Sequence, residues 1–195
     1  MELKDSKTKY NLLRAFAGES QAMNRYIMSA GVAKKEGLYI IENLFYYTAN
    51  QEREHAQLYI KKLKEFAGTN LEIDAGYPID LYDTTLPLLK AAHHNEYEEW
   101  ETVYKTFGDI AKEEGFAPIA NTFYKVAEIE KTHGDRFNRY ATELESGTLF
   151  KKDQEIKWIC TNCGHIHVGK EALKVCPVCD HPQGFFMDFS LSLFE

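Results

Sequence analysis

Two stretches of this chain repeat each other: EGLYIIENLFYYTANQEREH at residues 36–55 and EGFAPIANTFYKVAEIEKTH at residues 114–133. A shift of 78 positions (114 − 36) aligns their glycines, asparagines and aromatic residues, and it also pairs Tyr26 with Tyr104. Both stretches end in Glu-x-x-His. A duplicated pair of helices predicts a bundle with a pseudo-two-fold axis, which would bring two half-sites face to face.

Helical spacing of apolar residues extends outward from the repeat over most of the chain. We expect a first helix that ends between Gly31 and Gly37, and three more over about residues 38–66, 86–114 and 118–145. The stretch from Thr69 to Thr85 has little periodicity and predicts one long connection. Two short connections and one long one are typical of a four-helix bundle with a single crossover.

The Glu-x-x-His motifs are Glu52 with His55 and Glu130 with His133. Residues three apart on a helix share one face, so each pair can point into the bundle together. A single copy would most often be a solvated glutamate and an unrelated histidine. Two copies at the same repeat offset instead predict a metal site.

The other two helices must then supply further carboxylates. Glu19 is the only acidic residue between Asp5 and Glu36, so we expect it to point inward. The third helix is rich in glutamate and does not single out its ligands, because such a stretch is often a solvated face. We favour Glu96 and Glu99 as inward positions, and we assign Glu98 and Glu101 to the solvated face.

One Glu from each of two helices, together with Glu-x-x-His from the other two, is the pattern of di-iron and di-manganese bundles. Buried carboxylates without a cation would repel one another and take up protons, so this set requires metal. Tyr26 and its mate Tyr104 are either core tyrosines or hydrogen-bond donors beside the metals. His93 and His94 are not needed as ligands, and we place them at the surface or behind the ligands.

The only cysteines form two Cys-x-x-Cys pairs near the end of the chain: Cys160, Cys163, Cys176 and Cys179. Two such pairs predict one metal ion with four sulfur ligands, either structural zinc or redox-active iron. Attachment to a di-iron bundle favours iron, because a redox centre needs an electron source. We expect a bundle domain over residues 1–147 and a cysteine domain over 148–195, with short strands at 156–159 and 185–189.

The formal net charge of −7 argues against binding to nucleic acid or to an anionic membrane surface. The sequence has no apolar run of about 18 residues, so no transmembrane helix is expected. The charged N-terminal residues do not resemble a secretory signal, and the cysteine usage suits a reducing compartment. We therefore expect a cytoplasmic protein.

Taken together, these motifs resemble the rubrerythrin family over nearly the whole chain. The marks are Ala15–Ala22 (AFAGESQA), both Glu-x-x-His motifs, Glu96-x-x-Glu99 and the Cys-Pro-x-Cys pair. The resemblance implies a mainly α fold: a ferritin-like four-helix bundle with a small C-terminal rubredoxin-like domain. It also implies three iron ions per chain, two in the bundle and one on the cysteines.

The resemblance further implies a role for each bundle residue. Glu52 and Glu130 would bridge the two irons. Glu19 would bind the first iron, and Glu96 and His133 the second. Glu99 and His55 would alternate as ligands of the first iron on oxidation and reduction, which supports Glu96 and Glu99 over their neighbours.

By the same resemblance, the protein would be a peroxidase that reduces hydrogen peroxide to water in protection against oxidative stress. Glu99, Tyr26 and Tyr104 are the candidates for proton delivery. Electrons would return through the four-cysteine iron from an external reductase, because the chain has no glycine-rich nucleotide motif. The implied assembly is a head-to-tail homodimer. The alternatives are a ferroxidase or iron-handling protein, and a non-enzymatic protein with zinc on the cysteines.

Overall fold

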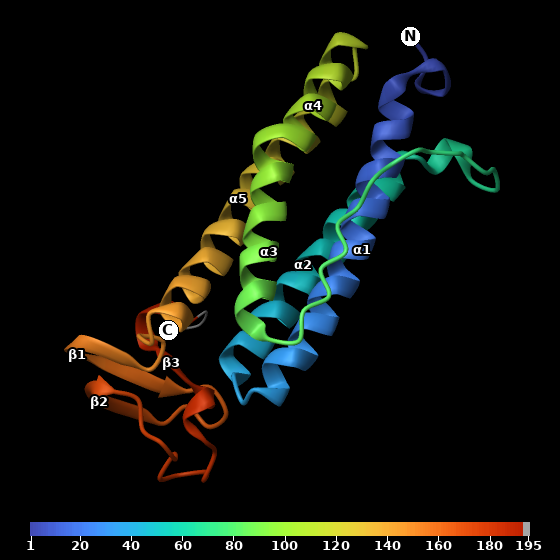
Figure 1. Ribbon diagram of the computed structural model, residues 1–195. Helices are drawn as coiled ribbons and strands as arrows, with labels where there is room; N and C mark the ends of the chain where they lie inside the picture. Colours follow the sequence, from blue (N-terminus) through green and yellow to red (C-terminus); the bar gives the residue numbers. More distant parts are fainter. Residues whose placement is uncertain (193–195) are drawn as a thin grey trace.

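The computed structural model describes residues 1–192 and shows a bundle of long helices followed by a small sheet (Figure 1). The bundle begins after the short 3₁₀ turn Leu3–Asp5. Its helical segments are α1 (Lys7–Lys35), α2 (Tyr39–Lys62), α3 (Thr85–Glu98), a π-helical turn (Glu99–Val103), α4 (Tyr104–Glu113) and α5 (Ala117–Glu145). No helix among residues 1–192 is both long and apolar enough to cross a bilayer. The predicted mainly α fold is confirmed.

Glycines close both hairpins of the bundle at positions related by the repeat. Gly37 follows α1 with φ of 73°, and Gly115 follows α4 with φ of 90°, a conformation that other residues adopt only with strain. The following N–H groups bond back to Ala33 and Ala111 at 2.9 and 2.8 Å, which satisfies carbonyls at each helix end. The two repeated sequences therefore form the same type of turn after α1 and after α4.

Each hairpin also caps the first helix of the other hairpin with a glutamate. The Glu114 carboxylate accepts hydrogen bonds from the backbone N–H groups of Lys7 and Thr8 at 2.8 and 2.9 Å. Its repeat mate Glu36 accepts one from the N–H of Thr85 at 2.8 Å. A carboxylate at a helix N-terminus satisfies N–H groups that have no partner within the helix and opposes the positive end of the helix dipole.

Matching aromatic clusters lie on either side of the middle of the bundle. Tyr26, Phe45 and Phe137 pack with ring centroids 5.1–6.0 Å apart. The shift of 78 positions relates them to Tyr104, Phe123 and Tyr59, whose centroids are 5.2–6.0 Å apart. The level between the clusters is therefore held from both sides by the same packing.

The crossover, residues 67–84, runs along α1 from one end of the bundle toward the other (Figure 1). Asp80 fixes it to the bundle, pairing with Arg25 at 2.5 Å and accepting a hydrogen bond from the Asn95 amide at 2.7 Å. The Tyr77 hydroxyl donates to the carbonyl of Arg14 at 2.9 Å. The predicted single long connection is therefore present, as an extended segment that packs along α1.

A three-stranded antiparallel sheet of order β2-β1-β3 forms the C-terminal module. Its strands are β1 (Lys151–Cys160), β2 (Ile166–Glu171) and β3 (Phe186–Asp188); β2 is absent from the strands predicted by sequence. Buried Trp158 and Phe186 form its core. Gly147 turns the chain after α5, so we propose the division into residues 1–147 and 148–195, of which 193–195 lie outside the described part.

The module packs on the α1–α2 turn of its own bundle. The rings of Tyr39 and Phe185 stack with centroids 4.1 Å apart. Gly184 approaches the carbonyl of Gly37 so closely that a Cβ at this position would lie 1.7 Å from the oxygen. Lys152 pairs with Glu143 at 2.7 Å on the α5 side. These contacts fix the position of the sheet at one end of the bundle.

The reciprocal caps give a test of how the two hairpins are joined. Substituting Glu114→Ala should lower the free energy of unfolding by about 1–2 kcal/mol, because two backbone N–H groups lose their partner. Urea denaturation followed by circular dichroism measures the change. The control is Glu113→Ala, an exposed neighbour, for which we expect a change within about 0.5 kcal/mol. Equal losses in the two variants would contradict the capping role.

Candidate metal centres

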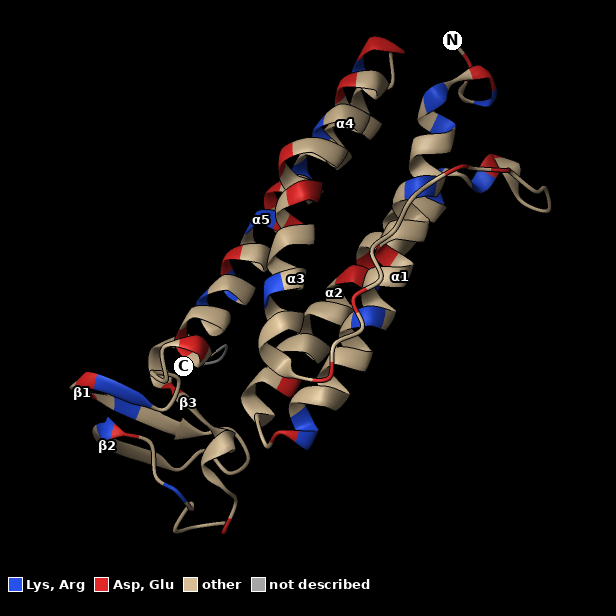
Figure 2. Ribbon diagram, viewed as in Figure 1, with Lys and Arg blue, Asp and Glu red and all other residues tan. Residues whose placement is uncertain are grey.

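The middle of the bundle brings together six of the predicted ligands, one or two from each of α1, α2, α3 and α5. They form two groups whose ligand atoms lie within 4.8 Å of one another: Glu19, Glu52, His55 and Glu130, and Glu52, Glu96, Glu130 and His133. Glu52 and Glu130 belong to both groups. Figure 2 shows acidic positions on α1, α2 and α3 along this part of the bundle. Two shared carboxylates are the arrangement that two bridged metal ions require.

Both histidines direct Nδ1 at the shared carboxylates. His55 Nδ1 lies 2.9 Å from Glu52 and 3.1 Å from Glu130. His133 Nδ1 lies 2.9 Å from each of the same two residues. Glu19 and Glu96 stand on the outer sides, 3.9 Å from His55 and 3.6 Å from His133. The two groups are therefore related by the repeat in geometry as well as in sequence.

The residues fit metal ions because several of their buried polar atoms, although close to one another, have no hydrogen bond of acceptable geometry. Both oxygens of Glu130, one each of Glu19, Glu52 and Glu96, and Nδ1 of His133 have none among residues 1–192. The ligand residues are between 0 and 8% exposed. Unpartnered buried carboxylates are costly, and divalent cations at the centre of each group would satisfy them. The mixed carboxylate and imidazole set suits iron.

The pKa values show how strongly the buried carboxylates repel one another without metal. Burial, followed by repulsion from Glu130, raises the pKa of Glu19 well above its usual value. Burial, followed by repulsion from Glu52, raises the pKa of Glu96 to about 8. Burial alone would lower the pKa of His55, but the carboxylates of Glu130 and Glu52 close to its ring outweigh burial and raise that pKa to about 10. Protons thus substitute for the charge that metal ions would bring.

The two tyrosines contact the outer carboxylates. The hydroxyl of Tyr104 donates a hydrogen bond to Glu19 at 2.5 Å, and the hydroxyl of Tyr26 donates one to Glu96. Burial, with the neighbouring carboxylates, raises the pKa of both tyrosines well above the usual value, so both keep their protons. Of the two interpretations left open by the sequence, the structure supports hydrogen-bond donors beside the ligands.

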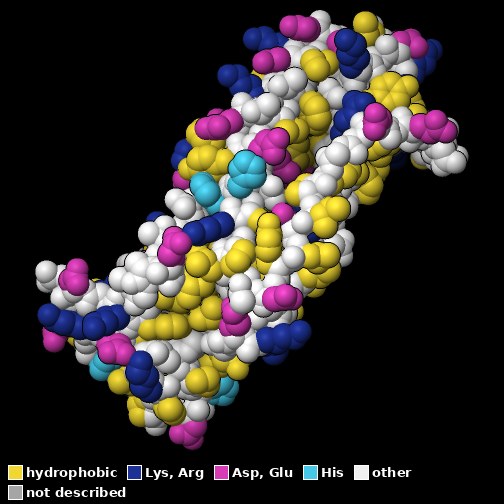
Figure 3. All heavy atoms as spheres, in the orientation of Figure 1, with side chains coloured by type: hydrophobic (Ala, Val, Ile, Leu, Met, Phe, Trp, Pro, Cys, Tyr) yellow, Lys and Arg dark blue, Asp and Glu magenta, His cyan; other side chains and the backbone are white. Residues whose placement is uncertain are grey.

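Glu99 lies apart from both groups, half-buried, and lines a cavity of about 250 Å³ with Tyr104 and Glu98. Gly76 and Tyr77 of the crossover form the opposite wall. Acidic side chains gather beside the upper part of the crossover on this face (Figure 3). Burial, followed by repulsion from Glu96, raises the pKa of Glu99 well above its usual value. Glu99 thus lines this cavity with a carboxyl that holds a proton more readily than a free glutamate does.

The π-helical turn explains why Glu99 has no counterpart in α1. Glu19 precedes Tyr26 by 7 residues (26 − 19), whereas Glu96 precedes Tyr104 by 8 (104 − 96). A π-helical turn accommodates one extra residue without breaking the helix, and Glu99–Val103 is such a turn. The helix expected over residues 86–114 is present as α3, this turn and α4, but the turn itself was not predicted. The unequal spacing was the sequence signal that could have predicted the turn.

The residues assigned to the surface divide as follows. Glu98, Glu101 and His94 are exposed. His93 is half-buried and its Nδ1 lies 3.1 Å from the carbonyl oxygen of Gly134, behind the ligand helix α5. The sequence analysis missed Gln51, whose amide oxygen lies 3.1 Å from Nε2 of His133. Its repeat mate is Ile129, so the repeat gave no signal for it.

The four cysteines form a second centre at the edge of the sheet. Their sulfur atoms lie within 4.8 Å of one another, with Cys160 and Cys179 3.8 Å apart and Cys163 and Cys176 3.7 Å apart. A tetrahedral ion with bonds of about 2.3 Å to sulfur has edges of about 3.8 Å, so the set fits one metal ion. A backbone N–H hydrogen bond from His181 lowers the pKa of Cys179 to about 6, which favours the thiolate.

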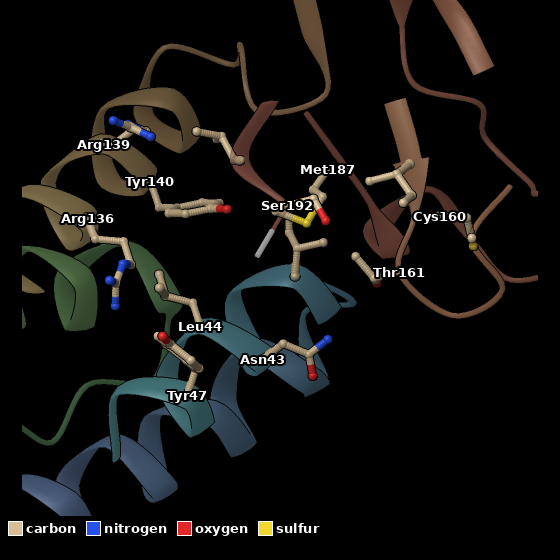
Figure 4. A pocket seen from close by; sticks show the side chains of 14 residues that line it. Asn43, Leu44, Tyr47, Arg136, Arg139, Tyr140, Cys160, Thr161, Met187 and Ser192 are labelled. Atoms are coloured by element: carbon tan, nitrogen blue, oxygen red, sulfur yellow. The ribbon is translucent and has the colours of Figure 1, made fainter. Parts of the chain in front are cut away.

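Beside the contacts that pack the module on the bundle, a cavity of about 400 Å³ lies between the module and the bundle end (Figure 4). Tyr47, Arg136 and Tyr140 line it from α2 and α5, and Cys160 and Thr161 line it from the module. The module wall therefore includes the cysteine ligand Cys160. The bundle wall includes Tyr47 and Arg136, both of which contact Gln51.

These features define a class of protein: a carboxylate-bridged di-metal four-helix bundle that carries a four-sulfur metal module. Known proteins of this class match the chain. The model of the Rubrerythrin family matches residues 10–141, and that of the rubrerythrin rubredoxin-like domain matches residues 158–187. A rubrerythrin of Clostridium perfringens is 44% identical over 96% of both chains. One of Nitratidesulfovibrio vulgaris is 43% identical over 94% of this chain and 95% of its own.

Solved structures agree with the sequence comparisons. A fully reduced, all-ferrous nigerythrin superimposes with a TM-score of 0.63 at 27% identity, over 95% of this chain and 90% of that one. The chain belongs to the rubrerythrin family. It is an iron-dependent oxidoreductase with a di-iron domain and a rubredoxin-like iron domain.

The raised pKa values predict how pH affects the protein when its bundle metals are removed. Glu96 has a folded pKa of about 8 against 4.5 for the free side chain, and His55 has about 10 against 6.5. The folded state therefore binds more protons, so the free energy of unfolding should fall as pH rises from 6.5 to 8. Glu96 alone contributes about 2 kcal/mol to this fall.

Urea denaturation at pH 6.5 and 8 measures the slope. Glu96→Gln should flatten it, whereas Glu98→Gln, which changes an exposed neighbour, should leave it unchanged. An unchanged slope in Glu96→Gln would show that this carboxyl is not protonated by its surroundings.

Proposed function

We propose that this protein is a peroxidase that reduces hydrogen peroxide to two water molecules with two electrons and two protons, in protection against oxidative stress. The observation that supports this most directly is the pair of ligand groups sharing Glu52 and Glu130, with Glu99 on the wall of a cavity. We propose Glu19, Glu52, His55, Glu96, Glu99, Glu130 and His133 as bundle ligands, and Cys160, Cys163, Cys176 and Cys179 as ligands of the third iron.

When bound, the two ferrous ions supply one electron each and act as Lewis acids toward the peroxide oxygens. The chain holds the bridging carboxylates in place by burying them between two matched aromatic clusters. The same burial excludes water from the reacting level, which strengthens every electrostatic interaction there. Peroxide would approach through the cavity lined by Glu99, Tyr104 and the crossover residue Tyr77.

Glu99 is the first candidate for proton delivery. Burial and repulsion raise its pKa well above the usual value, which favours a protonated carboxyl when Glu99 is not bound to iron, and it lines the cavity through which peroxide would arrive. A group of this kind can donate to the leaving oxygen as the O–O bond breaks. Tyr104 lines the same cavity, and Tyr26 lies at the equivalent place beside Glu96. Because both tyrosines keep their protons, they can hold the outer carboxylates in position or pass a proton on.

We propose that electrons return through the four-cysteine iron from an external reductase. Within one chain, Glu130 lies 15 residues before the end of α5 at Glu145 (145 − 130), so the bundle end is about 22 Å from the ligands along the helix. The module packs at that end. A head-to-tail homodimer would place a partner's module nearer to the bundle centre, and we propose this assembly.

The four-cysteine module favours a peroxidase over the alternative of iron handling. An iron-handling bundle has little use for an attached one-electron relay, whereas a peroxidase must be re-reduced after each turnover. The two functions also differ in what peroxide does to the reduced protein.

We expect about 1.5 equivalents of peroxide per chain, which accept the three electrons of three ferrous ions, to restore the full colour of the ferric four-cysteine site when added to the anaerobically reduced, iron-loaded protein. Stopped-flow visible absorption would follow this colour. A relay between copies of the chain predicts that the colour returns more slowly when the protein is diluted until it dissociates. A module that stays bleached while peroxide persists would refute the peroxidase and favour iron handling.

Replacing Glu99 tests the proton donor. Glu99→Gln should slow peroxide reduction by about 10²- to 10⁴-fold, because an amide cannot supply the proton. Loss of rate should be accompanied by a changed pH profile, and iron content measured by a chelator assay should show that the metals remain. The matched control is Glu101→Gln, an exposed residue of the same π-helical turn. Equal rates in the two variants would remove Glu99 from the mechanism.

A further inference from the structure

The outer nitrogen of His133 is held by a hydrogen-bonded set of side chains. Nε2 of His133 lies 3.1 Å from the amide oxygen of Gln51. The same oxygen accepts a hydrogen bond from the guanidinium of Arg136 at 3.5 Å, and the Gln51 amide nitrogen donates to the hydroxyl of Tyr47 at 3.5 Å. Arg136 also packs over the Tyr47 ring, 5.2 Å from its centroid. Figure 4 shows both residues at the bundle wall of the cavity.

This arrangement decides which nitrogen of His133 faces the metal. Arginine has no acceptor, so the Gln51 atom beside Arg136 must be the oxygen. That oxygen can only accept from His133, so Nε2 of His133 carries its hydrogen. Nδ1 is then left as a lone pair, directed at Glu52 and Glu130 at 2.9 Å. The side chains thus fix both the tautomer and the ring orientation that a metal ligand needs.

The repeat provides no such arrangement for His55. The shift of 78 positions relates Gln51 to Ile129, Arg136 to Leu58 and Tyr47 to Lys125. Ile129 and Leu58 are 39 and 40% exposed, and neither can accept or donate a hydrogen bond. Within residues 1–192, the only hydrogen bond recorded for the His55 ring is from Nδ1 to Glu52. Solvent can supply a hydrogen-bond partner for the outer nitrogen of His55. Unlike Gln51, it does not fix the orientation of the ring.

The two halves of the centre are otherwise closely matched. Each has one outer carboxylate with a tyrosine donor, one histidine and the same two shared carboxylates. Glu99 would add charge to the half with Glu19, but its carboxyl lies outside both ligand groups. The difference on the outer side of the histidines is therefore the main built-in inequality between the halves.

We infer that Gln51, oriented by Arg136, makes the Glu96–His133 half of the centre the tighter metal site, so that the first ferrous ion binds there. The ring of His133 is already ordered, whereas the ring of His55 must be ordered when its ion binds. Residues that orient a ligand in this way change metal affinity by about 10- to 100-fold. The inference rests on the two ligand groups, in which Glu99 takes no part, and not on the peroxidase reaction.

Anaerobic titration of ferrous ion against a competing chelator tests the order, using full-length protein whose four-cysteine site already holds iron. The wild-type protein should bind two ions in steps that differ by about tenfold or more. Gln51→Leu should weaken the tighter step by about 10- to 100-fold and leave the other unchanged. Gln57→Leu is the matched control, because Gln57 lies on the same helix and bonds only to exposed Glu54.

Two further variants assign the steps to the halves. Glu96→Ala should abolish the tighter step, whereas Glu19→Ala should abolish the weaker one. Ile129→Gln supplies the missing acceptor beside His55 and should strengthen the weaker step by up to about tenfold. Circular dichroism would establish that each variant keeps its helices.

The outcomes separate this inference from its premises. Two equal steps in the wild-type protein, or a Gln51→Leu variant that binds as the control does, would overturn the order of binding while leaving the ligand set intact. Loss of the tighter step in Glu19→Ala would reverse the assignment. A bundle that binds no ferrous ion would overturn the ligand set, and the inference with it. None of these results depends on whether the protein reduces peroxide.

Discussion

The structure depends on keeping several carboxylates buried at one level of a four-helix bundle. Glu19, Glu52, Glu96 and Glu130 are between 0 and 2% exposed, and when no metal is bound their mutual repulsion is opposed by two histidines, two tyrosine donors and protons. Burying like charges is costly, so the rest of the bundle must hold the helices together around them. Two matched aromatic clusters, two glycine turns and two reciprocal glutamate caps do so from both ends.

Departures from the internal symmetry separate the two halves of the centre. The π-helical turn inserts one residue after Glu96 and places Glu99 on a cavity wall, with no equivalent on α1. Gln51 orients His133, whereas its repeat mate Ile129 has no side-chain group that could bond to His55. A centre made of two identical halves would bind two ions alike. On our proposals, these two differences let the His133 side hold its ion more tightly and give the other side Glu99 as a proton donor.

Much of this protein could be predicted from the sequence, because a duplicated helical hairpin leaves a strong periodic record. The repeat determined the mainly α fold, the pairing of Glu52 with Glu130 and His55 with His133, and the turns at Gly37 and Gly115. The two Cys-x-x-Cys pairs determined a four-sulfur group, because such pairs place sulfur atoms around one ion. The assignment of each predicted ligand to a particular iron remains a prediction.

Only the tertiary structure decided features that arise from contacts between segments far apart in sequence. It placed Glu99 outside both ligand groups, it brought Gln51 from α2 to His133 on α5, and it stacked Tyr39 on Phe185 to fix the module at the bundle end. Periodicity reports which face of a helix is buried, but it does not report which polar side chain of a neighbouring helix lies opposite. The sequence therefore determined which residues point inward, and the packing of helices decided what each of them meets there.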